Sequence, residues 1–214
     1  LQYYRGKLIR KEGENFLEIT EINGEECHKE VPVTVFIGID PASSTRQTAD
    51  FSTIVPLAVD SKDNRYLLPY FRKRATPMSL AENIINYFKL YKPDKTRIES
   101  VGYQEMLREY IRHRCDEEGM FISGLEIKEN PRTSKSSRLE TMEPVFAQKK
   151  VYIQPEMSEI KDELLLYPRG KNDDLLDGLY YANKKVYTPT HKSDKSDKPK
   201  VRRLSLREES WLVA

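Results

Sequence analysis

The sequence has few cysteines, few histidines and no long hydrophobic run. Its 214 residues include two cysteines and three histidines. Cys27 and Cys115 form no CxxC motif, so the sequence predicts neither a disulfide framework nor a zinc site. No apolar run approaches the roughly 18 residues of a membrane-spanning helix, and no signal peptide pattern opens the chain. These absences exclude a secreted disulfide-rich protein and favour a chain without membrane spans that works in a reducing cytoplasm.

An excess of charge of one sign is also lacking. Lys and Arg number 36 against 34 Asp and Glu, which leaves a formal net charge of +2. Any affinity for nucleic acid must therefore come from the distribution of charge. A GxxxxGK[ST] nucleotide-binding loop is absent. The length fits one domain with a full core plus shorter appendages. Because residue 1 is Leu and not Met, we expect the chain to be part of a longer protein.

Three apolar, β-branched runs predict strands in the first third of the chain. They are VTVFIGID (33–40), STIVPLAVD (52–60) and RYLLPYFRK (65–73). The short polar link SKDN predicts a hairpin between the last two. Before them, residues 1–31 alternate only weakly and contain turn signals at Gly13 and at Asn23-Gly24. We expect this segment to be an arm, either a hairpin or a linker.

Helical periodicity begins at Pro77 and ends before Pro93. Later patterns predict a strand at 96–100, a helix at 103–118, a strand at 122–128, a helix at 136–148, an extended run at 151–155, and helices at 158–166 and 173–185. This order predicts an α/β fold with a mixed central sheet and helices on both faces.

The composition changes after Pro189. The stretch HKSDKSDKPK has almost no apolar residue and predicts disorder, while VRRLSLREESWLVA regains apolar residues that could dock on the domain or on a partner. We therefore expect an arm at 1–31, a folded domain at 32–188 and a tail at 189–214.

Carboxylates stand where two of the predicted strands end. Asp40 closes the 33–40 strand, and Glu99 lies at the end of the 96–100 strand. If these strands are parallel neighbours, both carboxylates emerge at the edge of the sheet where α/β folds place their sites. The alternative is that each acid caps a turn or a following helix.

A third group of acids lies in NDDLLDGLYYA. At about 100° per residue, Asp173, Asp174 and Asp177 share one arc of a helix beside its apolar stripe. The helix dipole accounts for Asp173 and Asp174, because acids stabilise a first turn. It accounts less well for Asp177, because three like charges within five residues repel one another unless a cation lies between them.

Carboxylates without His or Cys favour Mg²⁺ or Mn²⁺ over zinc. Two such ions about 4 Å apart can activate a water and stabilise the leaving oxygen of a phosphodiester. The acids therefore predict a hard-metal site that serves phosphodiester hydrolysis.

The ordered set IGIDPA, ADFSTIV, IES and NDDLLDGLYYA resembles the ribonuclease H-like superfamily and, within it, the nuclease domain of the phage large terminase. The resemblance covers roughly residues 33–187. It implies a ribonuclease H-like fold with Asp40, Glu99 and Asp174 as the metal-binding triad and Asp173 or Asp177 as an accessory acid. The tandem aspartates leave open which of the three is the primary ligand.

The resemblance also implies an activity and its partners. The activity is a DNA endonuclease with two Mg²⁺ or Mn²⁺ ions, cutting concatemeric double-stranded DNA with little sequence specificity at the packaging motor in the host cytoplasm. The partners are the ATPase domain of the same protein, joined through residues 1–31, the portal and the small terminase subunit. We expect the isolated domain to be a monomer. The alternatives are another ribonuclease H-like nuclease (a resolvase, a transposase or an RNA·DNA hybrid hydrolase) and a non-enzymatic interaction module.

Basic residues gather in NPRTSKSSRLE, at residues 130–140. Arg132, Lys135 and Arg138 lie at the polar start of a predicted helix, where charge and helix dipole both suit phosphate contact without sequence specificity. The resemblance implies a lysine near the metal site, for which Lys135 is the candidate. The alternative is a solvated helix start. A second basic run, FRKRA (71–75), is a weaker candidate because edge strands use such charges to prevent aggregation.

Overall fold

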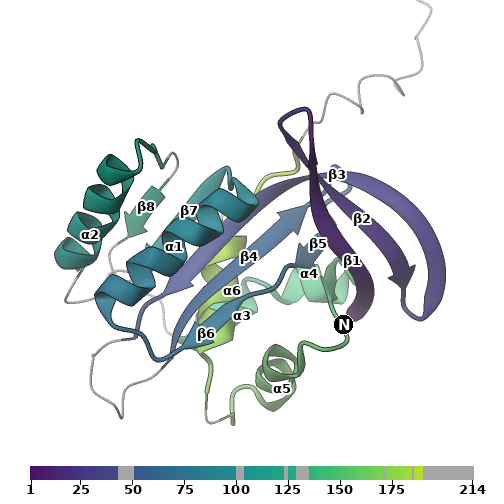
Figure 1. The fold of residues 1–214 in the computed structure, drawn as a ribbon. Helices are drawn as coiled ribbons and strands as arrows, with labels where there is room; N and C mark the ends of the chain where they lie inside the picture. The colour runs from purple at the N-terminus through teal and green to yellow at the C-terminus, as the bar shows by residue number, and fades with distance from the viewer. Residues whose placement is uncertain are drawn as a thin grey trace, which may run out of the picture.

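The computed structural model describes residues 1–42, 51–99, 104–122, 125–128, 135–170, 172–184 and 186–189. These residues form a mixed nine-stranded sheet with helices on both faces, which confirms the predicted fold class (Figure 1). The strands are β1 (Gln2–Lys11), β2 (Glu14–Ile22), β3 (Glu25–Asp40), β4 (Ser52–Val59), β5 (Arg65–Leu67), β6 (Phe71–Lys73), β7 (Lys95–Glu99), β8 (Leu125–Lys128) and β9 (Val151–Ile153). The helices are α1 (Pro77–Tyr91), α2 (Gln104–Glu117), α3 (Lys135–Glu140), α4 (Glu143–Ala147), α5 (Ser158–Leu166) and α6 (Asp174–Asn183).

None of the described helices is long and apolar enough to cross a membrane. Disorder was predicted for the tail, and residues 190–214 lie outside the described part of the chain.

The centre of the sheet is the second half of β3. It pairs antiparallel with β4 and parallel with β7, which in turn pairs parallel with β8. The strand expected at 65–73 is two short strands, β5 and β6, which pair with opposite ends of β4. Pro69 lies between them and has no N–H to donate to the ladder, which explains the interruption. The gap is tied to β4 by the N–H of Leu68, which donates to the carbonyl of Pro56 at 3.0 Å.

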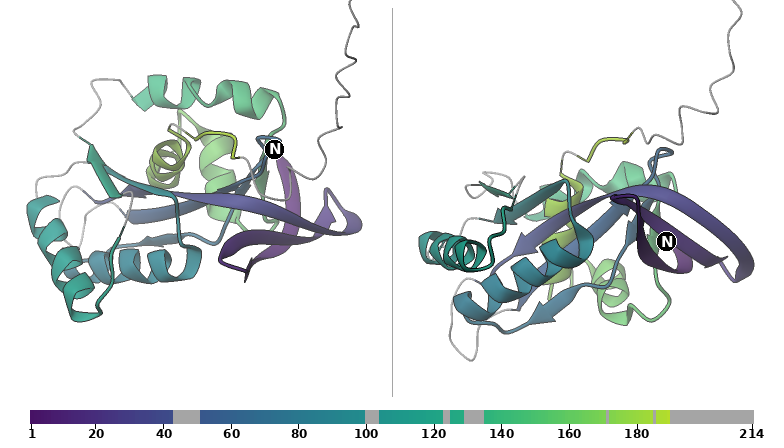
Figure 2. Two further views of the ribbon diagram at one scale, coloured as in Figure 1. Left: turned by 90° about the horizontal axis from the view of Figure 1, so that it is seen from above. Right: turned by 45° about the horizontal axis from the view of Figure 1, so that its top comes forward.

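The N-terminal strands belong to the same sheet. β1 and β2 form an antiparallel hairpin, β2 pairs with the first half of β3, and the start of β1 pairs parallel with β9, which also pairs with β5. Strands β3, β4, β5, β9, β1 and β2 therefore close into a ring, which curls around at the N-terminal end of the domain (Figure 2). Tyr4, Leu17 and Ile19 from this segment are buried in the core. The boundary expected at residue 31 thus falls inside β3.

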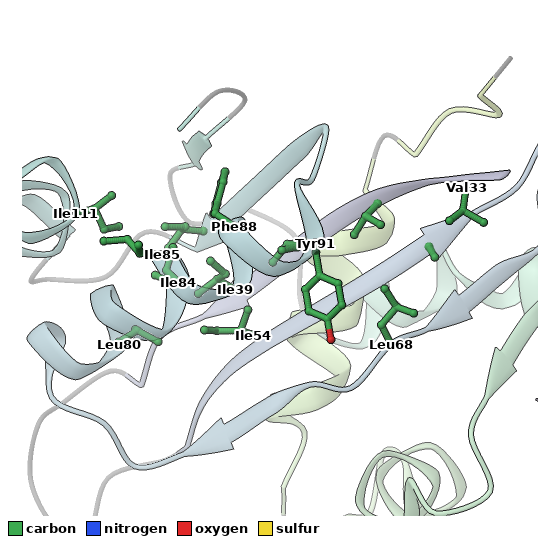
Figure 3. Close-up of a cluster of buried hydrophobic side chains, with 14 of the residues drawn as sticks. Val33, Ile39, Ile54, Leu68, Leu80, Ile84, Ile85, Phe88, Tyr91 and Ile111 are labelled. Carbon is green, nitrogen blue, oxygen red and sulfur yellow. The ribbon is translucent and has the colours of Figure 1, made fainter. Parts of the chain in front are cut away.

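Each face of the sheet carries its own core. On one face, α1 places Leu80, Ile84 and Phe88 against Ile39 and Ile54 of the central strands (Figure 3). Each fully buried side chain of this kind stabilises the fold by about 1.5–3 kcal/mol. On the opposite face, α6 packs its apolar residues against β3 and β4, and α5 packs against α6.

Helix α1 has the termini that its sequence predicts. The hydroxyl of Thr76 accepts a hydrogen bond from the N–H of Ser79 at 3.2 Å, and Pro77 occupies the first turn. Lys92 ends the helix in the left-handed region, with φ 42°. By contrast, the helix expected at 136–148 is two helices, α3 and α4. Pro144 lies in the first turn of α4 and has no N–H for a carbonyl four residues earlier, so one continuous helix cannot form there.

Helix α6 lies close to the sheet because a glycine stands on each side of the contact, Gly38 in β3 and Gly178 in α6. A Cβ atom on Gly38 of β3 would lie 1.9 Å from the carbonyl oxygen of Gly178 and 2.3 Å from the N atom of Ala182. A Cβ atom on Gly178 would lie 2.6 Å from Cγ2 of Val55 in β4. Glycine at both positions therefore allows the backbones of α6 and β3 to touch. The contact brings the first turns of α6 over the end of β3.

Candidate metal centre

Three carboxylates from separate elements converge at one end of the central strands. Asp40 is the last residue of β3, and Glu99 is the last residue of β7, its parallel neighbour in a register that pairs Ile39 with Ile98. Asp177 comes from α6, next to Gly178. The candidate ligand atoms of Asp40, Glu99 and Asp177 all lie within 4.8 Å of one another. The strand adjacency anticipated from the sequence is thus present, and a helical acid joins it.

The surroundings of Asp40 disfavour its charged form. Burial, a hydrogen bond with Glu99 and the charges of Glu99, Asp177 and Asp174 raise the pKa of Asp40 well above its usual range. Burial and the charge of Glu99 likewise raise the pKa of Tyr181. Carboxylates held this close repel one another, so positive charge is needed to stabilise the charged form of the cluster.

Arg138 supplies such a charge in this structure. Its Nη1 donates to Oδ1 of Asp177 at 3.0 Å, and its Nη2 donates to Oε1 of Glu99 at 3.1 Å. The residue is only 7% exposed, and its guanidinium lies 5.7 Å from the ring centre of Tyr181. The sequence placed Arg138 against DNA phosphate, whereas in the folded domain its guanidinium faces the acids of the cluster.

The other two helical acids are not members of this group of three. Asp174 is buried, with its carboxylate 3.7 Å from Nη2 of Arg72, and its charge still reaches Asp40. Asp173 is the N-cap residue of α6, and its carbonyl accepts the N–H of Asp177 at 2.9 Å. Among the acids of α6, the geometry therefore favours Asp177 as a companion of Asp40 and Glu99.

The basic candidates are placed only in part. Lys135 is the first residue of α3, one turn before Arg138, and Arg132 lies outside the described residues. In the second basic run, Arg72 is ion-paired with Glu159 at 2.8 Å. The guanidinium groups of Arg72 and Arg74 lie 4.2 and 4.9 Å from the ring centre of Phe51.

Glu163 supports the site, and the sequence analysis did not single it out. Its Oε2 accepts the N–H groups of Leu175 and Leu176 at 3.0 and 3.2 Å, so a side chain of α5 caps the start of α6. Its Oε1 lies 3.5 Å from Nη2 of Arg72. The only signal in the sequence is an acid at a position that the helical periodicity of 158–166 places on the buried side. This cap helps to fix the helix that carries Asp177.

Glu163 makes the stability of the domain depend on pH. Burial raises its pKa from 4.5 to about 7, although Arg72 and the two N–H groups favour the charged form. Because the folded pKa is the higher one, the contribution of Glu163 to stability is greatest below pH 4.5 and is lost as the pH rises toward 7. We expect Glu163→Gln to remove a decline of about 2–3 kcal/mol, because an amide oxygen keeps the cap without the charge. Urea unfolding of both proteins at several pH values between 4.5 and 7.5 measures this, and equal slopes would contradict it.

Solved structures of a phage nuclease share the fold. The large terminase nuclease from the thermophilic phage G20c is similar with a TM-score of 0.53 and 15% identity over 83% of this chain and 91% of that one. The structure of the same nuclease with bound magnesium has a TM-score of 0.50 and 16% identity, over 83% of this chain and 90% of that one. A yeast mitochondrial Holliday junction resolvase has a TM-score of 0.44 and 14% identity, over 68% of this chain and 76% of that one. No curated protein matches the chain.

The sequence itself matches a family model. The model describes the terminase ribonuclease H-like domain and covers residues 37–185, well over half of the chain. The matched span contains Asp40, Glu99 and Asp177 together with the end of β3, all of β7 and α6. The resemblance seen in the sequence motifs is thereby confirmed, and the chain belongs to the terminase ribonuclease H-like domain family.

Proposed function

We propose that this chain is a metal-dependent DNA endonuclease, the nuclease domain of a viral DNA-packaging terminase. The convergence of Asp40, Glu99 and Asp177 within 4.8 Å, in a chain of this family, carries the proposal. Structures of the similar phage G20c nuclease with bound magnesium and with bound zinc support a divalent ion in this fold.

The donor set fits a hard divalent cation. All three candidate ligands are carboxylates, and Mg²⁺ or Mn²⁺ prefers such oxygen donors. When bound, two such ions would supply a nucleophilic water and Lewis-acid stabilisation of the leaving oxygen. Asp40, Glu99 and Asp177 would hold them, with Asp174 and Asp173 as accessory acids. The neighbouring acids and burial raise the pKa of Asp40, and a bound cation would favour its charged form.

The remaining roles concern the substrate. We propose that Lys135 and Arg132, which lie just before Arg138 in the chain, contact the phosphates of double-stranded DNA and hold the strand beside the acids. Contact with phosphate carries no sequence information, so we expect cleavage with little sequence preference. The natural substrate would be concatemeric viral DNA in the host cytoplasm. The ATPase domain of the full-length protein, the portal and the small terminase subunit would be the partners.

Divalent-ion dependence and substrate choice test this function. We expect the purified domain to nick supercoiled plasmid in Mn²⁺ or Mg²⁺ and to lose this activity in EDTA. In competition, linear duplex should inhibit nicking at least as well as a four-way junction or an RNA·DNA hybrid. Preference for the junction or the hybrid would instead indicate a resolvase or a hybrid hydrolase. Absence of metal-dependent cleavage of every substrate would overturn the proposal.

A further inference from the structure

We propose that Arg138 is a built-in cation that occupies the acid cluster in the absence of metal and must leave Glu99 and Asp177 before the divalent ions bind. This inference rests on the proposed metal-dependent function. It gives Arg138 a role other than the DNA contact expected from the sequence, namely to oppose metal binding.

The contacts of Arg138 coincide with the candidate ligands. Two of the three acids in the cluster, Glu99 and Asp177, each accept a hydrogen bond from its guanidinium, at 3.1 and 3.0 Å. Oxygen atoms that accept these bonds have less capacity left for a metal ion, which requires ligands at about 2.1 Å. A guanidinium and a divalent cation would also repel each other across this short distance. The arginine and the ion therefore compete for the same carboxylates.

The hydrogen bonding of Arg138 is incomplete for a purely structural ion pair. Its Nε is buried and has no hydrogen-bond partner among the described residues. A buried donor left in this state costs about 1–3 kcal/mol. The guanidinium thus neutralises carboxylate charge while one of its own N–H groups is left without a hydrogen bond. The attraction between its positive charge and the carboxylates accounts for the position of the Arg138 guanidinium.

Two aromatic rings lie beside the Arg138 guanidinium. The ring centres of Tyr180 and Tyr181 lie 5.8 and 5.7 Å from it. Aromatic faces at this distance attract a cation. When Arg138 leaves the acids, we expect its guanidinium to stay beside these two rings while α3 stays folded.

Binding of Mn²⁺ to four proteins tests the competition by isothermal titration calorimetry. The proteins are the wild type, Arg138→Met, Arg138→Lys and a control, Arg112→Met, which changes an exposed arginine of α2. We expect Arg138→Met to bind Mn²⁺ at least tenfold more tightly than the wild type, because its competitor is gone. Arg138→Lys keeps a cation and should bind close to the wild type, as should the control.

The stability of the metal-free proteins gives a second readout. Without ions, Arg138→Met should melt at a lower temperature than the wild type, because the acids lose their counter-charge, and saturating Mn²⁺ should raise its melting temperature more than that of the wild type. If Arg138→Met does not fold, Arg138→Gln provides a neutral variant that still donates hydrogen bonds, and it should also bind Mn²⁺ more tightly.

The outcomes separate this inference from the function on which it rests. Equal or weaker Mn²⁺ binding by the neutral variants, with clear binding by the wild type, overturns the inference alone and makes Arg138 a residue that positions the ligands. Absence of Mn²⁺ binding in all proteins overturns the metal site itself. A crystal structure with Mn²⁺ in which Arg138 keeps both contacts would also overturn the competition.

Discussion

Replacement of Asp177 by Asn is expected to lower Mn²⁺-dependent plasmid nicking by at least about 100-fold. Asp177 lies with Asp40 and Glu99 in a group whose ligand atoms are within 4.8 Å of one another, and an amide cannot supply the same charge to a divalent ion. Asp40→Asn should have a comparable effect. Asp174→Asn should retain much more activity, because the carboxylate of Asp174 lies beside Arg72.

The comparison between these aspartates decides the ligand assignment. Initial rates at saturating Mn²⁺, with circular dichroism to confirm folding, measure the effect of each variant. Asp116→Asn makes the same chemical change at an exposed position of α2 and should cut at the wild-type rate. If Asp174→Asn proves more damaging than Asp177→Asn, the primary ligand is Asp174, the residue that the resemblance alone suggests.

Gly38→Ala is expected to destabilise the domain by about 3 kcal/mol or more. The new methyl group would lie 1.9 Å from the carbonyl oxygen of Gly178 and 2.3 Å from the N atom of Ala182, and backbone atoms cannot rotate away as a side chain can. Helix α6 must therefore move off the sheet, and Asp177 moves with it. Urea unfolding measures the loss of stability, and Mn²⁺ titration should show weakened binding as well.

Gly170→Ala is the matched control for this change. A Cβ atom there would have its nearest neighbours at 3.4 Å, close to ordinary van der Waals contact. Its stability should stay within about 0.5 kcal/mol of the wild type. If Gly38→Ala proves equally harmless, the close contact between α6 and β3 does not hold the helix in place.

The sequence was most informative where local chemistry and long-range packing agree. The bounds of α1 follow from Thr76, Pro77 and the apolar spacing, and β3 ends at Asp40 as its apolar run does. The position of Glu99 beside Asp40 was expected on the condition that their strands are parallel neighbours, and the register of β3 and β7 meets that condition. These features depend on short segments whose preferences the fold does not override.

The choice between Asp174 and Asp177 could not be made from the sequence. The two residues point about 60° apart on a helix, so either can face the strand ends, depending on how the helix is rotated. That rotation is set by the contact of Gly178 with Gly38 and by the cap from Glu163, both of which join distant segments. The inward orientation of Arg138 has the same origin, because only the assembled fold brings Glu99 and Asp177 to it.

The ring of strands has a consequence for the order of folding. Gln2 pairs with Tyr152 and Tyr3 with Ile153, whereas β1, β2 and β3 pair with neighbours in the chain. Closing a loop of about 150 residues costs more chain entropy than forming a hairpin, so the local strands can assemble well before β1 meets β9. On the ribosome, the pairing of β1 with β9 must wait until most of the domain has been synthesised. Inside the ring, the hydroxyl of Tyr4 donates to the carbonyl of Leu67 and Gln154 donates to the carbonyl of Gly6, so these buried polar groups find their partners only when it closes.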